Sequence, residues 1–127
     1  MKQLFNALTI CGIAFTMAFL SSCEKKYFVA PTEPIMDVSF STDMQPYFDA
    51  KCISCHGGNI PPNLTSPGSY DALQGTNNSG DKYVDTDNPE SSVLYTAIIP
   101  GGSMDEYANA TEREMTLVWI TEGAKDN

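Results

Sequence analysis

Apolar residues form one largely continuous run near the N-terminus, at 8–20, and thereafter only short clusters between polar, glycine- and proline-containing segments. No segment alternates apolar and polar residues for the length of a strand, whereas three segments repeat apolar residues at helical spacing. A fourth, shorter segment at 69–74 is long enough for one helical turn. We therefore expect an all-α domain with three or four short helices separated by long loops.

The first helix is predicted over 44–51, where Tyr47, Phe48 and Ala50 supply apolar side chains. Asp43 is its expected N-cap, because a short polar side chain can accept a backbone N–H of the first turn. Pro46 then falls at the third helical position, where its missing N–H has no intrahelical partner to lose.

The second helix is predicted within 88–99, with Asn88 as its cap and Pro89 at the favoured first position. Its apolar residues recur at i, i+1, i+4 and i+5, which is the spacing of one helix face. They are Val93, Leu94, Ala97 and Ile98.

The third helix is predicted within 111–125, opening with a capping box of Thr111 and Glu114 and ending at Gly123. Its apolar row, which we expect to be buried, consists of Met115, Val118 and Trp119. So few and such short helices make a thin core. The long loops between them need a further apolar body to pack on.

The N-terminal segment has the features of an export signal. Lys2 precedes the apolar run, and the run is shorter than the ~20 residues that a membrane-spanning helix needs. The sequence LSSC that ends at Cys23 resembles the lipobox of bacterial lipoproteins. This resemblance implies that the signal peptide 1–22 is removed and that Cys23 carries lipid. The alternative is an ordinary secretory signal followed by a free cysteine.

Behind the signal we expect a lipidated tether at 23–39 and one small domain at 40–127. The tether has two prolines and neither helical nor alternating periodicity. The whole chain has 7 Lys and Arg against 16 Asp and Glu, a formal net charge of −9. Such acidity disfavours nucleic acid as a partner and favours a protein with a basic patch, although it also serves solubility alone.

The segment 51–58, KCISCHGG, places a histidine directly after the second of two closely spaced cysteines. Structural zinc needs four ligands, and Cys55 and His56 are too close in sequence to share one tetrahedral ion easily with Cys52. A redox-active thiol pair is expected after a strand of a βαβ unit, for which the sequence has no signal. An inert disulfide is a further alternative.

Covalent haem attachment, by contrast, uses all three side chains of this motif. The thiols of Cys52 and Cys55 bond the two vinyl groups, and His56 becomes the proximal ligand of the iron. The motif lies behind a secretory signal, and c-type attachment takes place in that compartment. We therefore expect one haem c.

The second iron ligand can be sought by elimination. His56 is the single histidine, so one chain cannot supply two histidine ligands, and methionine is the next common neutral ligand. Met36 lies in the tether, Met44 begins the first helix, and Met115 belongs to the apolar row of the last helix. Met104 lies in the loop PGGSMDEY between the last two helices and is our candidate. The alternative is an exposed loop methionine.

Five segments in order resemble the monohaem c-type cytochromes of the bacterial class I type, in the variety often found as lipoproteins. They lie at 38–58, 61–66, 69–73, 87–98 and 111–124. The resemblance implies a small cytochrome c-like fold around one covalently bound haem. It also implies that a proline carbonyl, of Pro61 or Pro62, faces the free ring nitrogen of His56. In that family the distal methionine is usually followed by proline, whereas Met104 is followed by Asp105.

The resemblance also implies that the first and last helices cross, with Tyr47 or Phe48 against Val118 and Trp119. The implied function is single-electron transfer by a carrier that is not an enzyme, since two protein ligands leave no open position on the iron. Two alternatives are a five-coordinate haem protein, acting as a small-ligand sensor or weak peroxidase, and a haem-bearing subunit of a larger redox complex.

The expected partners are redox proteins with a basic docking patch, and the membrane through the lipid on Cys23. We expect an exported protein that faces the periplasm or the cell surface. Glu24 follows the lipidated cysteine where many inner-membrane lipoproteins have aspartate, and this favours the outer membrane.

Replacing Cys23 with serine should release the protein from the membrane, because serine offers no thiol for lipid attachment. Cell fractionation should then find the variant in the soluble periplasmic or culture fraction, with the haem absorption of the wild type. Unchanged membrane association of this variant would show that lipid at Cys23 is not the anchor.

Overall fold

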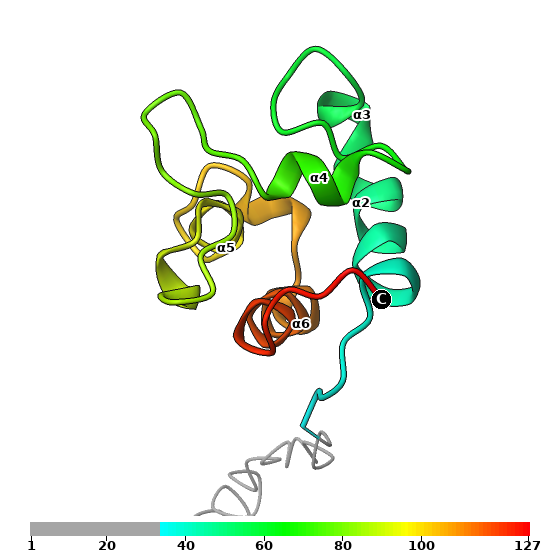
Figure 1. Ribbon diagram of the computed structural model, residues 1–127, viewed down its shortest axis with the longest axis vertical. Coiled ribbons are helices and arrows are strands. Elements are labelled where there is room, and N and C mark those ends of the chain that lie inside the picture. The colour runs from blue at the N-terminus through cyan, green and yellow to red at the C-terminus, as the bar shows by residue number, and fades with distance from the viewer. Residues whose placement is uncertain (1–33) are drawn as a thin grey trace, which may run out of the picture. The chain divides into compact units, whose positions relative to one another are not determined.

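A computed structural model describes residues 34–127, and the predicted signal peptide, Cys23 and most of the predicted tether lie outside this range. The described chain is helical (Figure 1), and its sole β-pairing is an isolated bridge between Thr76 and Lys82. The prediction of an all-α chain is thus confirmed for the secondary structure of the described residues. Among the helices between residues 34 and 127, none has the length and apolar character of a membrane span.

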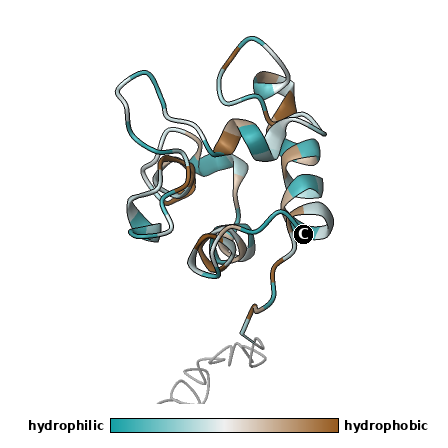
Figure 2. Cartoon of the chain, viewed as in Figure 1, coloured by the Kyte–Doolittle hydropathy of each residue, from teal (hydrophilic) through white to brown (hydrophobic). Residues whose placement is uncertain are grey.

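The elements in chain order are η1 (Phe40–Met44), α2 (Gln45–Lys51), α3 (Ile53–His56), α4 (Ser69–Leu73), η2 (Pro89–Ser91), α5 (Val93–Ile98), η3 (Asp105–Tyr107) and α6 (Ala110–Thr121). Long loops join them, and α4 forms where a helical turn was predicted. In Figure 2 the loop around 76–82 is largely hydrophilic, whereas apolar residues gather on the helices.

The first helical segment begins earlier than predicted. Its N-cap is Ser39, whose hydroxyl accepts the N–H of Thr42, while the carboxylate of Asp43 accepts the N–H of Ser39 at 2.8 Å. Asp43 therefore lies inside the first turn, η1, and its prediction as the cap was wrong. This turn is a π-helix, in which the N–H of Gln45 donates to the carbonyl of Phe40, and Pro46 is the second residue of the following helix α2.

The predicted continuous helix at 88–99 is interrupted at Ser92, and Asn88 makes no capping bond through its side chain. Ser92 is fully buried, and its hydroxyl accepts the N–H of Asp85 at 2.8 Å. The next two N–H groups, of Val93 and Leu94, donate to carbonyls of the preceding loop. These bonds to the preceding loop outweigh local helix propensity. The first part of the predicted helix therefore forms only the short 3-10 turn η2, and the last part forms α5.

The last helix, α6, starts before the predicted capping box. Asn109 and Glu112 form the box instead of Thr111 and Glu114, with each side chain bonded to the other residue's backbone N–H. The end was predicted correctly, because Gly123 follows the C-cap with a φ of +99°, a conformation that favours glycine.

The core is built on an aromatic cluster that joins the first and last helical segments. The ring of Phe40 lies 6.2 Å from Phe48, 5.2 Å from Tyr70 and 5.4 Å from Trp119, measured between ring centroids. The resemblance implied Tyr47 or Phe48 against Val118 and Trp119, whereas the ring of Trp119 pairs with those of Phe40 and Tyr70. The fully buried residues of α6 are Thr116, Trp119 and Ile120. Met115 and Val118, predicted to be buried, pack at the edge of the core and are only partly buried.

The packed chain includes the end of the segment predicted as tether. Val38 is buried, and the backbone N–H groups of Asp37 and Val38 donate to the two carboxylate oxygens of Glu122 at 2.9 and 3.1 Å. The C-terminal end of α6 therefore holds the chain just before η1.

The observed cap gives a direct test of where α6 begins. Asn109→Ala should lower the free energy of unfolding of the mature protein by about 0.5–2 kcal/mol, because it leaves an N–H of the first turn without a partner. Thr111→Ala removes a hydroxyl from an exposed residue that makes no capping bond and should change stability little. Denaturant unfolding of both variants measures the difference. A larger loss in Thr111→Ala than in Asn109→Ala would instead place the cap at the predicted position.

Candidate functional site

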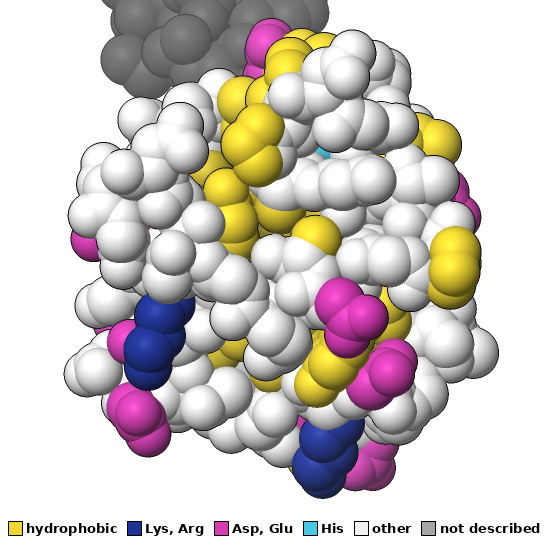
Figure 3. All heavy atoms as spheres, turned by 45° about the horizontal axis from the view of Figure 1, so that its top comes forward, with side chains coloured by type: hydrophobic (Ala, Val, Ile, Leu, Met, Phe, Trp, Pro, Cys, Tyr) yellow, Lys and Arg dark blue, Asp and Glu magenta, His cyan; other side chains and the backbone are white. Residues whose placement is uncertain are grey.

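A cavity of about 400 Å³ lies between α2 and α3 with their following loop on one side and α5 with its following loop on the other. Figure 3 shows this face as a hollow floored by hydrophobic side chains, with acidic side chains at its edge. Its volume is in the range of small-molecule and cofactor sites. Apolar wall residues include Phe48, Leu64, Val93, Leu94, Ala97 and Ile98.

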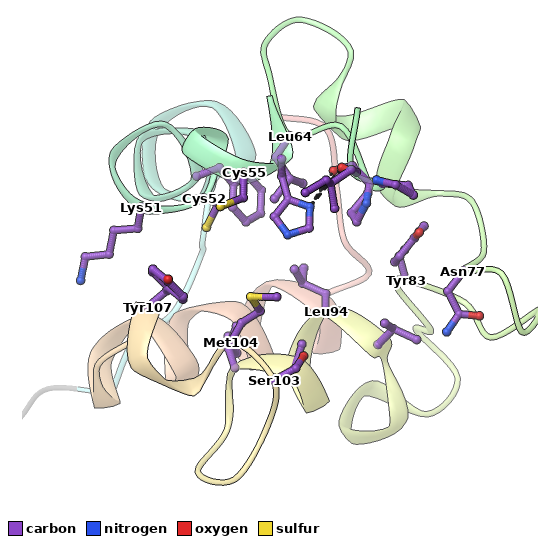
Figure 4. Close-up of a pocket in the computed structure, with 18 of the residues that line it drawn as sticks. Lys51, Cys52, Cys55, Leu64, Asn77, Tyr83, Leu94, Ser103, Met104 and Tyr107 are labelled. Carbon is purple, nitrogen blue, oxygen red and sulfur yellow. Dashed lines mark hydrogen bonds between the residues drawn. The ribbon is translucent and has the colours of Figure 1, made fainter. Parts of the chain in front are cut away.

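The two cysteines of the KCISCHGG motif lie side by side on one wall of this cavity (Figure 4). Cys52 separates α2 from α3, and Cys55 lies within α3, so helical geometry places their side chains on one face. Both are free thiols, Cys52 half-buried and Cys55 exposed. Burial raises the pKa of Cys52, which opposes the thiolate that a redox-active pair requires.

His56 ends α3, and its ring is oriented by the loop that follows. Its Nδ1 lies 3.2 Å from the carbonyl oxygen of Pro62 and 3.2 Å from that of Ile60. A neutral imidazole that donates from Nδ1 keeps Nε2 as a lone-pair ligand. Of the two prolines named from sequence, Pro62 makes this contact. Pro61 lines the cavity, and the Ile60 carbonyl was not anticipated.

Met104 lies on the opposite wall, in the loop between α5 and η3. Its thioether points into the cavity (Figure 4), and the residue is half-buried against the core. The other methionines in the described chain do not line the cavity. Met44 is fully buried in the core, Met115 packs at its edge, and Met36 is 68% exposed.

The Met104 loop is folded tightly onto α5. The N–H of Met104 donates to the carbonyl of Ala97 at 2.7 Å. A Cβ on Gly102 would collide with the carbonyl oxygens of Thr96 and Ala97, so the approach needs glycine. Asp105, at the position where the resembled family usually has proline, accepts the N–H of Gly101 at 3.0 Å through its carboxylate.

Tyr47 brings a buried hydroxyl to the cavity that sequence reasoning did not single out as functional. The residue is 6% exposed, and its hydroxyl has no hydrogen-bond partner among the described residues. Burial raises its pKa far above the usual range, so the group stays a protonated donor. The neighbouring Cys52 thiol also raises the pKa of Tyr47, and the Tyr47 hydroxyl is a donor available to a group bound in the cavity.

The rim carries exposed apolar and acidic side chains. Ile60 and Tyr107 are exposed. The pKa of Tyr107 is raised, first of all by hydrogen bonding between its hydroxyl and the neighbouring Glu106. Lys51, at the Cys52 end, pairs with Glu112 at 2.9 Å. Within residues 34–127 no group of three or more His, Cys, Asp and Glu side chains is arranged to hold a metal ion.

No protein-family model, curated protein or solved structure matches the chain.

Proposed function

We propose that the domain is a c-type cytochrome that carries single electrons, with one haem bonded to Cys52 and Cys55 and held by His56 and Met104 as axial ligands. One observation carries the proposal: a single apolar cavity collects two free thiols and an oriented imidazole on one wall and a methionine thioether on the other. The finer fold assignment, a small cytochrome c-like fold, is part of the same proposal.

The residues at the cavity fit such a group in their chemistry. The walls are mainly hydrocarbon, as a porphyrin requires, and the thiols are reduced and face inward. The carbonyl of Pro62 fixes the ring of His56 and raises the basicity of its free nitrogen. Tyr47 supplies an unpaired donor within the same cavity.

When bound, haem supplies the one-electron couple of its iron. The chain's own residues determine how that couple is used. His56 and Met104 would hold the iron from the two walls, which would leave no position for oxygen or peroxide, and a methionine ligand would raise the potential relative to histidine. The apolar walls limit the access of water, and thioether bonds from Cys52 and Cys55 would retain the group.

The acidic surface supports a redox partner with a basic docking patch. Two acidic residues, Asp105 and Glu106, lie between the cavity-lining Met104 and Tyr107. The whole sequence has a formal net charge of −9. Complementary charge raises the rate of encounter between such partners. We further propose that the domain is exported and held at the membrane by lipid on Cys23, and the outer membrane is favoured.

The five-coordinate alternative requires Met104 to leave the cavity. Its N–H bond to Ala97 and the close packing at Gly102 hold it inside, and so they favour the six-coordinate carrier. A role as a haem-bearing subunit of a larger redox complex is compatible with the same ligand set.

Covalent attachment should be visible by mass spectrometry of the exported protein, as the mass of one haem that survives acid and organic extraction. Cys52→Ala combined with Cys55→Ala should lose this mass and yield an unfolded or degraded chain, because the apolar cavity then lacks the group that completes the core. Ser54→Ala, a change at an exposed residue between the cysteines, is the matched control. Free thiols at both cysteines of the exported wild type would refute attachment.

Met104→Ala should abolish the far-red ferric absorption band that marks a methionine–iron bond, lower the potential and allow carbon monoxide to bind in the reduced state. Haem content and helical content should be retained, because the thioethers and His56 remain.

The matched controls are Met44→Leu and Met115→Leu, which alter packing residues at a cost of under ~1.5 kcal/mol and should keep the band. If the band persists in Met104→Ala and disappears in one of the controls, the methionine replaced in that control is the ligand, and the assignment of Met104 is wrong.

A further inference from the structure

The side chain of Arg113, near the start of α6, is half-buried and reaches across to the Met104 loop. Its Nε donates to the carbonyl oxygen of Ile98 at 2.7 Å, and its Nη2 donates to that of Asp105 at 2.8 Å. Ile98 is the last residue of α5, and Asp105 directly follows Met104. One guanidinium therefore ties both ends of this loop to the last helix.

The other hydrogen bonds of the loop are local. The bond from Met104 to Ala97 and the bond from Gly101 to Asp105 shape the segment 97–105, but neither connects it to α6. Among the hydrogen bonds of the described residues, those of Arg113 are the ones that join the loop to α6. Arg113 is thus the hydrogen-bonding link between the loop and α6 among the described residues.

The charge of Arg113 has no direct partner. Within the described chain no carboxylate lies within ion-pair distance of its guanidinium, whereas the ammonium groups of Lys51 and Lys82 lie 2.9 and 3.2 Å from Glu112 and Asp85. A half-buried cation without a counter-charge loses solvation, and its two bonds to neutral carbonyls offset that loss. Arg113 therefore interacts with the loop through its two hydrogen bonds and not through an ion pair.

We propose that Arg113 is the positioning residue for Met104: it holds the loop closed so that the thioether stays in the cavity. The proposal rests on the proposed ligation by Met104. The planar guanidinium can donate in two directions at once, whereas a lysine ammonium at the end of a flexible chain cannot span both carbonyls in the same way. Loss of the clamp raises the population of an open loop, and any ligand that competes with Met104 then binds more tightly.

The test compares Arg113→Gln and Arg113→Lys with Lys82→Met, which removes the same charge from an exposed ion pair outside the cavity. With ferric protein, the affinity for imidazole should rise roughly tenfold or more in Arg113→Gln, the factor expected when bonds from a charged donor are lost. Arg113→Lys should keep most of this increase, and Lys82→Met should match the wild type. Haem content and circular dichroism establish that each variant is loaded and folded.

A second measurement does not involve the iron. Hydrogen exchange at the Met104 amide, which is bonded to Ala97, should accelerate by a similar factor in Arg113→Gln, while the amide of Ile120 in the buried part of α6 stays protected. Acceleration at both sites would mean general destabilisation and would overturn the positioning role.

Unchanged imidazole affinity, unchanged exchange at Met104, or full rescue by lysine would each overturn the role assigned to Arg113. A failure of the proposed function differs from all of these, because the wild type itself would then lack bound haem or the far-red band. The exchange measurement still decides whether Arg113 holds the loop in that case.

Discussion

The contacts of the Phe40 ring determine how the two walls of the cavity face each other. This ring packs against Phe48 of α2, Tyr70 of α4 and Trp119 of α6, and aromatic pairs of this kind contribute about 0.5–1.5 kcal/mol each beyond their buried area. The end of α2 leads to Cys52 on one wall. The opposite wall is tied to α6 through Arg113. Both sets of proposed haem ligands are therefore placed relative to the same cluster.

The sequence predicts elements well where the determining interactions are local. The end of α6 follows from one glycine that adopts a positive φ, and the turn at α4 was anticipated. The break at Ser92 could not be predicted, because it depends on bonds to Asp85 and to two carbonyls of the preceding loop. The cap of α6 was misplaced because Asn109 and Thr111 are both good capping residues, and local sequence does not decide between them.

Some residues of the candidate site could be named from the sequence, and others could be found only in the structure. The motif itself names Cys52, Cys55 and His56, and elimination among four methionines leads to Met104, the one that lines the cavity within the described chain. The roles of Tyr47 and Arg113 could not be read from sequence. A tyrosine and an arginine on helices are ordinary surface or core residues until a hydroxyl is found buried without a partner and a guanidinium is found between two carbonyls.

The way the Met104 loop is restrained bears on how the domain can work. A proline after the methionine would stiffen the backbone in every state of the loop, because its ring limits φ whether the loop is open or closed. The two hydrogen bonds from Arg113, by contrast, act only when the loop is closed against α6. Opening costs these bonds all at once, so the closed state is well defined while the open chain keeps its freedom. If the domain carries haem as proposed, a side chain outside the proposed ligand set would stabilise the six-coordinate site, and α6 would control the balance between carrier and five-coordinate behaviour.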